Sequence, residues 1–294
     1  MRRASAQPDR LRSRLTLKYG AGFPIKALPD AAAIRDYAQT LEGAGFDFTG
    51  TAGHTLGQPD GSHPGRAAPQ YTRPFNDAFV TFAFLAGVTQ HIRFMSAILI
   101  LPALPTGLVA KQAAELALVS GGRFDLGIGT SWNAAEYRAP GQNFRHRGAR
   151  MEEQVTLPRR LWSEPYVTFK SQYHDFDNLG LARPAPAPIP IWFGTGTSEP
   201  ALRRVARLGD GWMTNGGFLP HVSRFQQCLR DAGRDPAGFP IRGSIVAGDG
   251  GPDAWIETAR KYRGAGVTHI AIGGPPGLSV AQSLERVIEA KAVM

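Results

Sequence analysis

The stretch GGRFDLGIGTSWNAAEY, residues 121–137, combines a turn signal, a short apolar strand pattern and a glycine-rich loop. Gly121 and Gly122 mark the turn, and residues 124–128 have the length and composition of a buried strand. Gly127 and Gly129 remove side chains from the carboxyl end of that strand, so another group can approach it closely. The alternative is that these glycines only relieve crowding where a strand meets a helix.

Strand and helix patterns alternate on both sides of this stretch. Strands are expected at residues 15–19, 46–51, 92–101, 124–128, 191–194, 211–214, 241–246 and 269–272. Helices are expected at residues 31–42, 77–89, 106–120, 147–162, 199–207 and 219–232, and after residues 253 and 279. Pro158 should kink or divide the fourth helix, because proline removes a donor and clashes with the preceding turn.

Eight such units predict an α/β fold, a TIM (β/α)8 barrel whose chemistry lies at the carboxyl ends of its strands. A hairpin at residues 167–170 and 173–176 is expected as an insertion before the fifth strand.

Length and composition favour one large domain. The chain has 294 residues and 43% hydrophobic content, enough for a full core, and no long linker divides it. We therefore expect a single barrel domain over residues 15–294. Residues 1–14 should form a basic, disordered tail, because five arginines and one aspartate give this segment +4 of the net charge of +9.

The composition also indicates a location. Cys228 is the single cysteine, which excludes an internal disulfide and fits a reducing cytoplasm. The sequence contains no secretory signal and no apolar run of about 18 residues, so we expect a cytoplasmic protein without a membrane span.

Carboxylates are nearly absent from the expected strand ends, which carry glycine, threonine, serine, Leu101, Asn215, one aspartate, Asp249, and one histidine, His54. A glycosidase needs two facing carboxylates, a metallohydrolase needs a His and Asp cluster, and a serine hydrolase of the common type needs a G-x-S-x-G elbow. None of these patterns is found, and no metal site is expected. Small residues around an open barrel end favour a bulky organic cofactor that brings its own reactivity.

The chain contains three blocks with a characteristic order and spacing: NDAFVTFAFLAGVTQHIRFMSAILILP (76–102), AKQAAELALVSGGRFDLGIGTSWNAAEY (110–137) and PIPIWFGTGTSEPALRRVARLGDGW (188–212). Together they resemble the luciferase-like monooxygenase superfamily, and more narrowly its probable coenzyme F420-dependent oxidoreductases. The resemblance implies a barrel of the bacterial luciferase-like type, a cofactor with a tricyclic redox ring, and a homodimer.

His54 matches the histidine that lies beside the cofactor ring in the deazaflavin-using relatives and serves in proton transfer. A neutral imidazole can give or take a proton at cellular pH, which suits a catalytic role. The alternative is a histidine merely hydrogen-bonded in a loop. Relatives often have an acidic residue just before this histidine, whereas this chain has Gly53, so no orienting carboxylate is expected there.

Further cofactor-binding residues are implied on the third and fourth strands. Ser96 and Ala97, with Ile98, match the segment that backs the ring in the family, commonly through a non-prolyl cis peptide. An ordinary buried strand is the alternative. Thr130 and Ser131 match the positions that contact the ring or its ribityl chain, where hydroxyls can donate and accept without adding charge.

The sequence GTGTS contributes Gly194, Gly196, Thr197 and Ser198 as candidate cofactor-binding residues. Backbone donors at a helix start, together with hydroxyls, can bind a phosphate, and the resemblance places the cofactor phosphate here. Simple capping of helix 199–207 by Ser198 is the alternative. Arg147 and Arg150 could assist a phosphate or belong to a solvated face.

The leading function is hydride transfer between coenzyme F420 and an unidentified small organic substrate, with the loop at residues 57–74 closing over that substrate. The alternative is an FMN-dependent monooxygenase that uses oxygen and reduced flavin from a separate reductase. A non-catalytic flavin-binding or nucleic-acid-associated protein is a third hypothesis. It ranks low, because no zinc-finger or RNP motif accompanies the basic charge.

Overall fold

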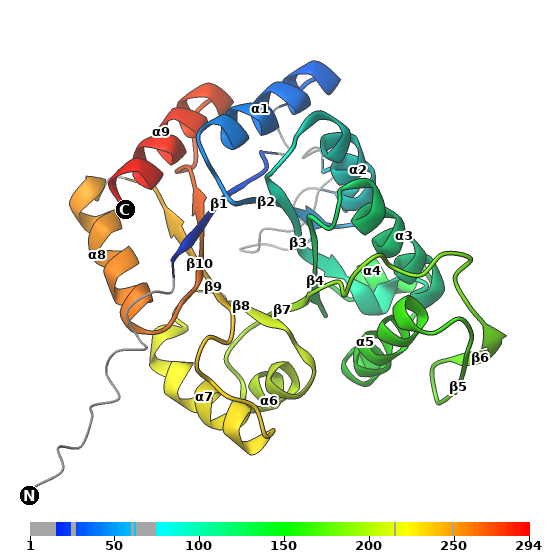
Figure 1. Cartoon of the computed structure of the whole chain (residues 1–294). Helices are drawn as coiled ribbons and strands as arrows, with labels where there is room; N and C mark the ends of the chain where they lie inside the picture. Colours follow the sequence, from blue (N-terminus) through cyan, green and yellow to red (C-terminus); the bar gives the residue numbers. More distant parts are fainter. Residues whose placement is uncertain (1–15, 25–27, 60–61, 63–74, 215, 249) are drawn as a thin grey trace, which may run out of the picture.

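The computed structural model describes residues 16–24, 28–59, 62, 75–214, 216–248 and 250–294. Within these residues, eight parallel strands close into a barrel in the order β1-β10-β9-β8-β7-β4-β3-β2, and helices surround it (Figure 1). The predicted TIM barrel is therefore confirmed. The predicted tail at residues 1–14 lies outside the described residues.

The barrel strands are β1 (Lys18–Gly22), β2 (Phe48–Gly53), β3 (Arg93–Ile100), β4 (Phe124–Gly129), β7 (Ile191–Thr195), β8 (Gly211–Thr214), β9 (Ile241–Val246) and β10 (His269–Gly273). The prediction for the first strand, residues 15–19, is displaced toward the N-terminus. Pairing with β10 begins only at Lys18, opposite His269, and continues to Ala21.

The helices are α1 (Ala31–Gly43), α2 (Ala78–Val88), α3 (Thr106–Val119), α4 (Ala135–Arg138), α5 (Arg147–Ser163), α6 (Glu199–Leu208), α7 (Val222–Asp231), α8 (Gly251–Gly264) and α9 (Val280–Val293), with 3-10 turns η2 (Leu101–Ala103), η3 (Phe144–His146) and η4 (Leu219–His221). Asp30 caps α1 by accepting the N–H of Ala33 at 2.8 Å. The helix predicted at 219–232 is divided into η4 and α7, and α4 was not predicted.

Pro158 does not divide α5, so the expected division was wrong. The helix runs through Pro158 from Arg147 to Ser163 and buries one face that includes the proline itself. Near its end, the indole N–H of Trp162 donates to the carbonyl of Ala110 in α3 at 2.8 Å. Packing of this face against α3 offsets the missing backbone donor.

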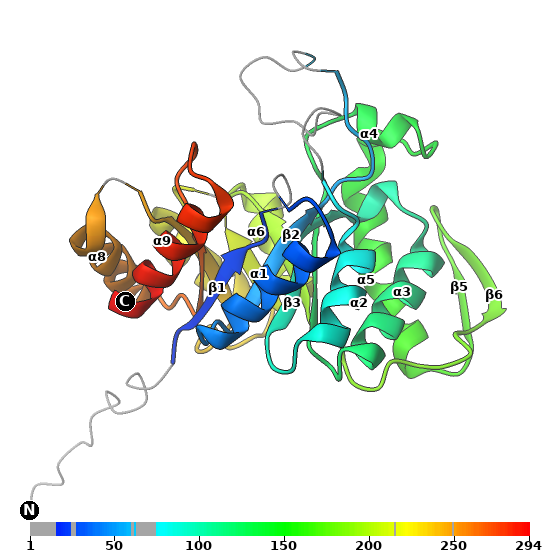
Figure 2. The ribbon, with the colours of Figure 1, turned by 90° about the horizontal axis from the view of Figure 1, so that it is seen from above.

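The predicted insertion before the fifth barrel strand is confirmed as an antiparallel hairpin of β5 (Val167–Lys170) and β6 (Asp175–Leu179). It lies outside the barrel beside α3 and α5 (Figure 2). His174, in its turn, is buried and lies 2.7 Å from both Thr106 Oγ1 and Glu153 Oε2, which attaches the hairpin to both helices.

Glycines shape the inner wall of the barrel. A Cβ at Gly127 would lie 1.8 Å from the carbonyl oxygen of Ser96, and one at Gly20 would lie 2.2 Å from the ring of Phe48. A small inner cluster of Phe48, Met95, Trp192, Met213 and Ala271 fills the space between the strands, while the main core lies between the strands and the helices. Gly20 and Gly127 are therefore required for close packing.

Candidate active site

His54 follows β2 at the carboxyl end of the barrel, where it meets a buried carboxylate. Its Nδ1 lies 2.8 Å from Glu136 Oε1, and the side chains of His54 and Glu136 are 29% and 4% exposed. The hydrogen bond to Glu136 leaves Nε2 as the ring nitrogen that can exchange a proton, since no other hydrogen bond to the ring is found among the described residues. A buried carboxylate on one nitrogen fixes the orientation of the ring.

Glu136 corrects one expectation from the sequence. We expected no orienting carboxylate for His54. That expectation was wrong, because Glu136 reaches His54 from α4, which lies beyond β4 and 82 residues away in the chain. The available signal was a glutamate directly before Tyr137 in the central sequence block.

Ser131 lies between β4 and this glutamate in an unusual backbone conformation. Its φ angle is +51°, in the left-handed region that residues other than glycine rarely adopt. Its hydroxyl accepts the N–H of Asn133 at 3.2 Å and lies 3.4 Å from Glu136 Oε2. Thr130, the preceding residue, is half-buried, and its carbonyl accepts the hydroxyl of Tyr137. Both predicted residues therefore lie beside the His54 and Glu136 pair.

The third strand carries a non-prolyl cis peptide between Ala97 and Ile98, as the resemblance implied. Ala97 and Ile98 are half-buried, whereas Ser96 is buried and its hydroxyl exchanges hydrogen bonds with the backbone of Gly127. Ser96 therefore links β3 to β4. Its hydroxyl is already used within the barrel wall, so any contact with a cofactor would come from Ala97 and Ile98.

The GTGTS segment separates into two parts. A Cβ at Gly194 would lie 2.3 Å from Ile98 Cγ2, so this glycine makes room for a neighbouring side chain. A Cβ at Gly196 would have no atom within 4 Å. Thr197 is half-buried and Ser198 is exposed, and Ser198 caps α6 without a side-chain hydrogen bond. Capping by the Ser198 hydroxyl, the alternative considered above, is therefore not observed.

The first residue of α6 adds charge to this segment. Glu199 accepts hydrogen bonds from Arg224 and Arg203, which lower its pKa to about 2. Two arginines and one glutamate leave a positive charge in excess beside the start of the helix. An anion at this end is favoured by that charge and by the helix dipole.

Arg147 and Arg150 are engaged elsewhere. The guanidinium of Arg147 lies 3.8 Å from the ring centroid of Phe144, and that of Arg150 donates to the carbonyls of Pro102, Leu104 and Tyr173. Their guanidinium groups therefore hold the chain together, and neither extends freely toward the GTGTS segment.

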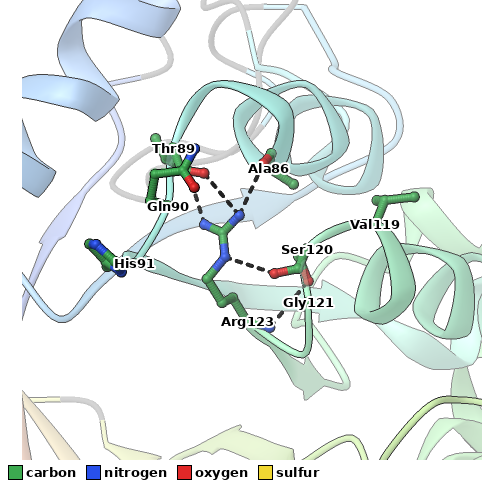
Figure 3. Close-up of a pocket in the computed structure, with 8 residues that line it drawn as sticks. All are labelled: Ala86, Thr89, Gln90, His91, Val119, Ser120, Gly121 and Arg123. Atoms are coloured by element: carbon green, nitrogen blue, oxygen red, sulfur yellow. Dashed lines mark hydrogen bonds between the residues drawn. The ribbon is translucent and has the colours of Figure 1, made fainter.

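A hollow of about 530 Å³ lies at the opposite end of the barrel (Figure 3). Its lining residues directly precede β3 and β4, and the guanidinium of Arg123 crosses it to donate to four backbone carbonyls, those of Ala86, Thr89, Ile92 and Ser120. Arg123 thereby binds the carbonyls at the C-terminal end of α2, and the hollow is separate from the His54 site.

Part of the predicted site lies outside the described residues. The loop at residues 57–74 is described only at residues 57–59 and 62, so its expected closure over a substrate stays a prediction. Among the described residues there is no group of three or more His, Cys, Asp or Glu side chains that could hold a metal ion. In the same residues, every helix is too short or too polar to cross a bilayer.

A family model described as luciferase-like monooxygenase matches residues 9–284. The chain belongs to the luciferase-like monooxygenase family. The TIM barrel is accordingly of the luciferase-like type, and members of the family are oxidoreductases and monooxygenases.

Three relatives show the range of this family. An uncharacterized protein of Mycobacterium tuberculosis, Rv0940c, is 35% identical over 206 residues, 68% of each chain. The F420-dependent hydroxymycolic acid dehydrogenase of the same species is 28% identical over 77% of this chain and 62% of its own. The FMNH2-dependent dimethylsulfone monooxygenase of Pseudomonas fluorescens is 31% identical over 64% of this chain and 49% of its own.

A solved structure extends the likeness of the fold. An F420-dependent secondary alcohol dehydrogenase, in complex with an F420-acetone adduct, superposes with a TM-score of 0.77 over 95% of this chain and 99% of its own, at 18% identity. At that identity the likeness supports the fold alone.

Proposed function

We propose that this protein transfers hydride between coenzyme F420 and a small organic substrate at the carboxyl end of the barrel. The observation that carries the proposal is the half-buried His54, held by Glu136 beside the inner wall of β3 and β4. The F420-dependent relative supports the choice of cofactor.

The residues at this end of the barrel fit a large cofactor with a phosphate. Gly196 leaves open space where a side chain would stand, and the hydroxyls of Thr197 and Ser198 lie at the start of a ten-residue helix. Pro200 has no N–H, and that of Ala201 already donates to the Ser198 carbonyl. We therefore assign phosphate binding to Gly196, Thr197 and Ser198, not to the first turn of α6 as a whole.

The half-buried Ala97 and Ile98 would support one face of the ring, and Thr130 and Ser131 would lie at its edge. When bound, the deazaflavin would supply the carbon that carries the hydride. His54 would hold or release a proton at Nε2, while Glu136 keeps the imidazole oriented and balances its charge. The protein contributes position and electrostatics to the reaction.

An FMN-dependent monooxygenase is the second candidate. The observation that favours it is the likeness to the dimethylsulfone monooxygenase, because the sequence identity of that enzyme to this chain is slightly higher than that of the F420-dependent dehydrogenase. The same residues of this chain would hold FMN, and a separate reductase would supply it in reduced form.

Titration of the purified protein with F420 and, separately, with FMN tests the proposal. F420 should bind with a stoichiometry of one, and Thr197→Val should weaken binding by roughly tenfold, because a hydrogen bond to a charged phosphate is lost. Thr156→Val, at an exposed position on α5, is the matched control and should change nothing. Binding of FMN alone would favour the second candidate, and binding of neither would refute both.

We also propose a homodimer formed through α2. This helix is apolar on every side, and while one face is buried, Val80 and Phe84 on the other are 70% and 40% exposed. An exposed apolar face of this kind indicates a contact with another protein surface, here a second copy of the chain.

A further inference from the structure

Arg242 is a cation on the inner wall of the barrel. It is the second residue of β9 and lies in register with Met213 of β8 and His269 of β10. The next residue, Gly243, faces α8, because a Cβ there would lie 2.6 Å from the ring of Tyr262. Since side chains alternate along a strand, Arg242 points toward the barrel axis, and its guanidinium carbon lies 5.8 Å from the ring centroid of Phe48 on β2.

Within the described residues, this guanidinium has no hydrogen-bond or ion-pair partner, and its one recorded contact is with the ring of Phe48. Nε of Arg242 is buried without a hydrogen bond, and no acceptor or carboxylate in this part of the chain contacts the rest of the side chain. The carboxylate of Asp125, on β4, is already bound by Arg93 at 2.9 and 3.0 Å. A planar group with five donors therefore lies in the barrel with its hydrogen-bonding capacity unused.

In the part of the chain that the structure describes, no carboxylate compensates the charge of Arg242. Burial lowers its pKa to about 10, so the group remains a cation at neutral pH. Burial also lowers the pKa of the adjacent His269 to about 3, which leaves that imidazole neutral. Arg242 is half-buried and only its Nε is recorded as buried without a hydrogen bond, so a cation in this place is stabilised by an anion that reaches it, which indicates that its role is to bind a ligand.

The inner wall above Arg242 is open toward the carboxyl end of the barrel. On the same side of β9, Ser244 is exposed and Val246 is 60% exposed, although both face inward by alternation. On β10, which pairs with β9, and on β1, the next strand beyond it, a Cβ at Gly273 or at Gly22 would have no atom within 4 Å. Arg242 thus lies below inward-facing positions that a ligand entering from this end can reach.

We propose that Arg242 binds a carboxylate of the organic substrate, so that this protein acts on small organic acids. The planar guanidinium matches the two oxygens of a carboxylate and can bind both. The inference rests on the proposed function only in placing the substrate at the carboxyl end of the barrel. The carboxylate site itself exists whether or not F420 is the cofactor.

Thermal unfolding of the full-length protein, without cofactor, tests the proposal with benzoate and malonate as probes. Each probe should raise the melting temperature of the wild type in a concentration-dependent manner. Arg242→Met should weaken the apparent affinity by roughly 30-fold or more, and Arg242→Lys should fall between the two, because it keeps the charge but loses the planar donor pair. Arg230→Met, at an exposed arginine of α7, should respond as the wild type does.

The stability of the variants without probe separates ligand binding from a structural role. Arg242→Met should melt at the same temperature as the wild type or higher, since a half-buried charge without an ion-pair partner is replaced by an unbranched apolar side chain. A lower melting temperature for this variant, with probe binding unchanged, would assign Arg242 to the fold and overturn the proposal. Absence of any probe effect on the wild type would also overturn it.

Cofactor titration distinguishes the substrate from the cofactor as the source of the oxygen atoms at Arg242. For each cofactor, F420 or FMN, the affinity of Arg242→Met should lie within about threefold of the wild-type affinity. A loss of cofactor affinity with benzoate binding intact would show that Arg242 contacts the cofactor, against the proposal. Probe binding without any cofactor binding would leave the carboxylate site intact and refute the proposed function instead.

Discussion

The imidazole of His54 is held at Nδ1 by a buried carboxylate and left open at Nε2, which is the arrangement a proton-transfer group needs. We predict that His54→Gln lowers kcat by about 10²- to 10⁴-fold and leaves cofactor affinity nearly unchanged. Glu136→Gln should lower kcat by a smaller factor, because the ring keeps a hydrogen-bond partner but loses the countercharge. Steady-state kinetics combined with cofactor titration checks both changes.

His91, exposed at the opposite end of the barrel, is the matched control for these variants. His91→Gln should keep wild-type rates. An unchanged kcat for His54→Gln would remove His54 from the chemistry and leave it as a loop residue.

His269 makes the stability of the fold depend on pH. Burial, with Lys18, Arg242 and Arg93 adding to it, lowers its pKa from 6.5 to about 3. The unfolded chain therefore takes up this proton first as pH falls. The stability that His269 contributes is complete above pH 6.5, declines by up to about 1.4 kcal/mol per pH unit below it, and levels off below about pH 3.

Urea unfolding of the wild type and of His269→Asn between pH 8 and pH 4 measures this dependence. The variant should show a shallower loss of unfolding free energy than the wild type, and His91→Asn should follow the wild type. Parallel curves for His269→Asn and the wild type would show that His269 does not titrate in this way.

At the level of elements, the end of β7 and the segment that leads into α6 contain two glycines in different surroundings, one crowded and one open. Gly194→Ala should destabilise the protein by roughly 1–3 kcal/mol, because the new methyl group meets Ile98 in a close-packed wall. Gly196→Ala should fold with nearly wild-type stability, since nothing lies within 4 Å, but should lose cofactor affinity because its methyl group enters the proposed phosphate site.

Urea unfolding and cofactor titration of both glycine variants separate these effects. Equal loss of stability in the two variants, or full cofactor affinity in Gly196→Ala, would contradict the assignment of this segment.

Strand and helix patterns make the barrel predictable from sequence, because each short apolar run is followed by a helix and glycines mark the transitions. The boundaries of single elements depend on contacts that a local pattern does not contain. β1 begins where β10 offers a partner, and α5 continues through Pro158 because its buried face packs against α3.

The candidate site was predictable only in part. The resemblance led to His54, Thr130, Ser131 and the GTGTS segment, and the structure places them at one end of the barrel, although their roles stay predictions. Glu136 and Arg242 were not inferred, because their importance lies in what surrounds each: Glu136 contacts a residue 82 positions away, and Arg242 has no hydrogen-bond or ion-pair partner in the described chain. For Gly194 the motif indicated a ligand contact, but the structure shows that glycine is needed there to leave room for the side chain of Ile98.

At the scale of the whole molecule, the exposed face of α2 predicts association. Val80→Glu combined with Phe84→Glu should convert the dimer to a monomer in sedimentation velocity, because two charges would be buried in an apolar interface. Leu179→Glu, at an exposed apolar position on the hairpin, should leave the dimer intact. A wild-type protein that sediments as a monomer would refute the proposed dimer.

The central claim is that the carboxyl end of this barrel binds a redox cofactor between the His54 and Glu136 pair and the GTGTS segment. A crystal structure of the protein with F420 tests it most directly. We predict the ring beside Nε2 of His54, with Ile98 at one face, and the phosphate within hydrogen-bond distance of Thr197 and Ser198. A cofactor bound elsewhere, or one whose ring and phosphate contact neither group, would contradict the account.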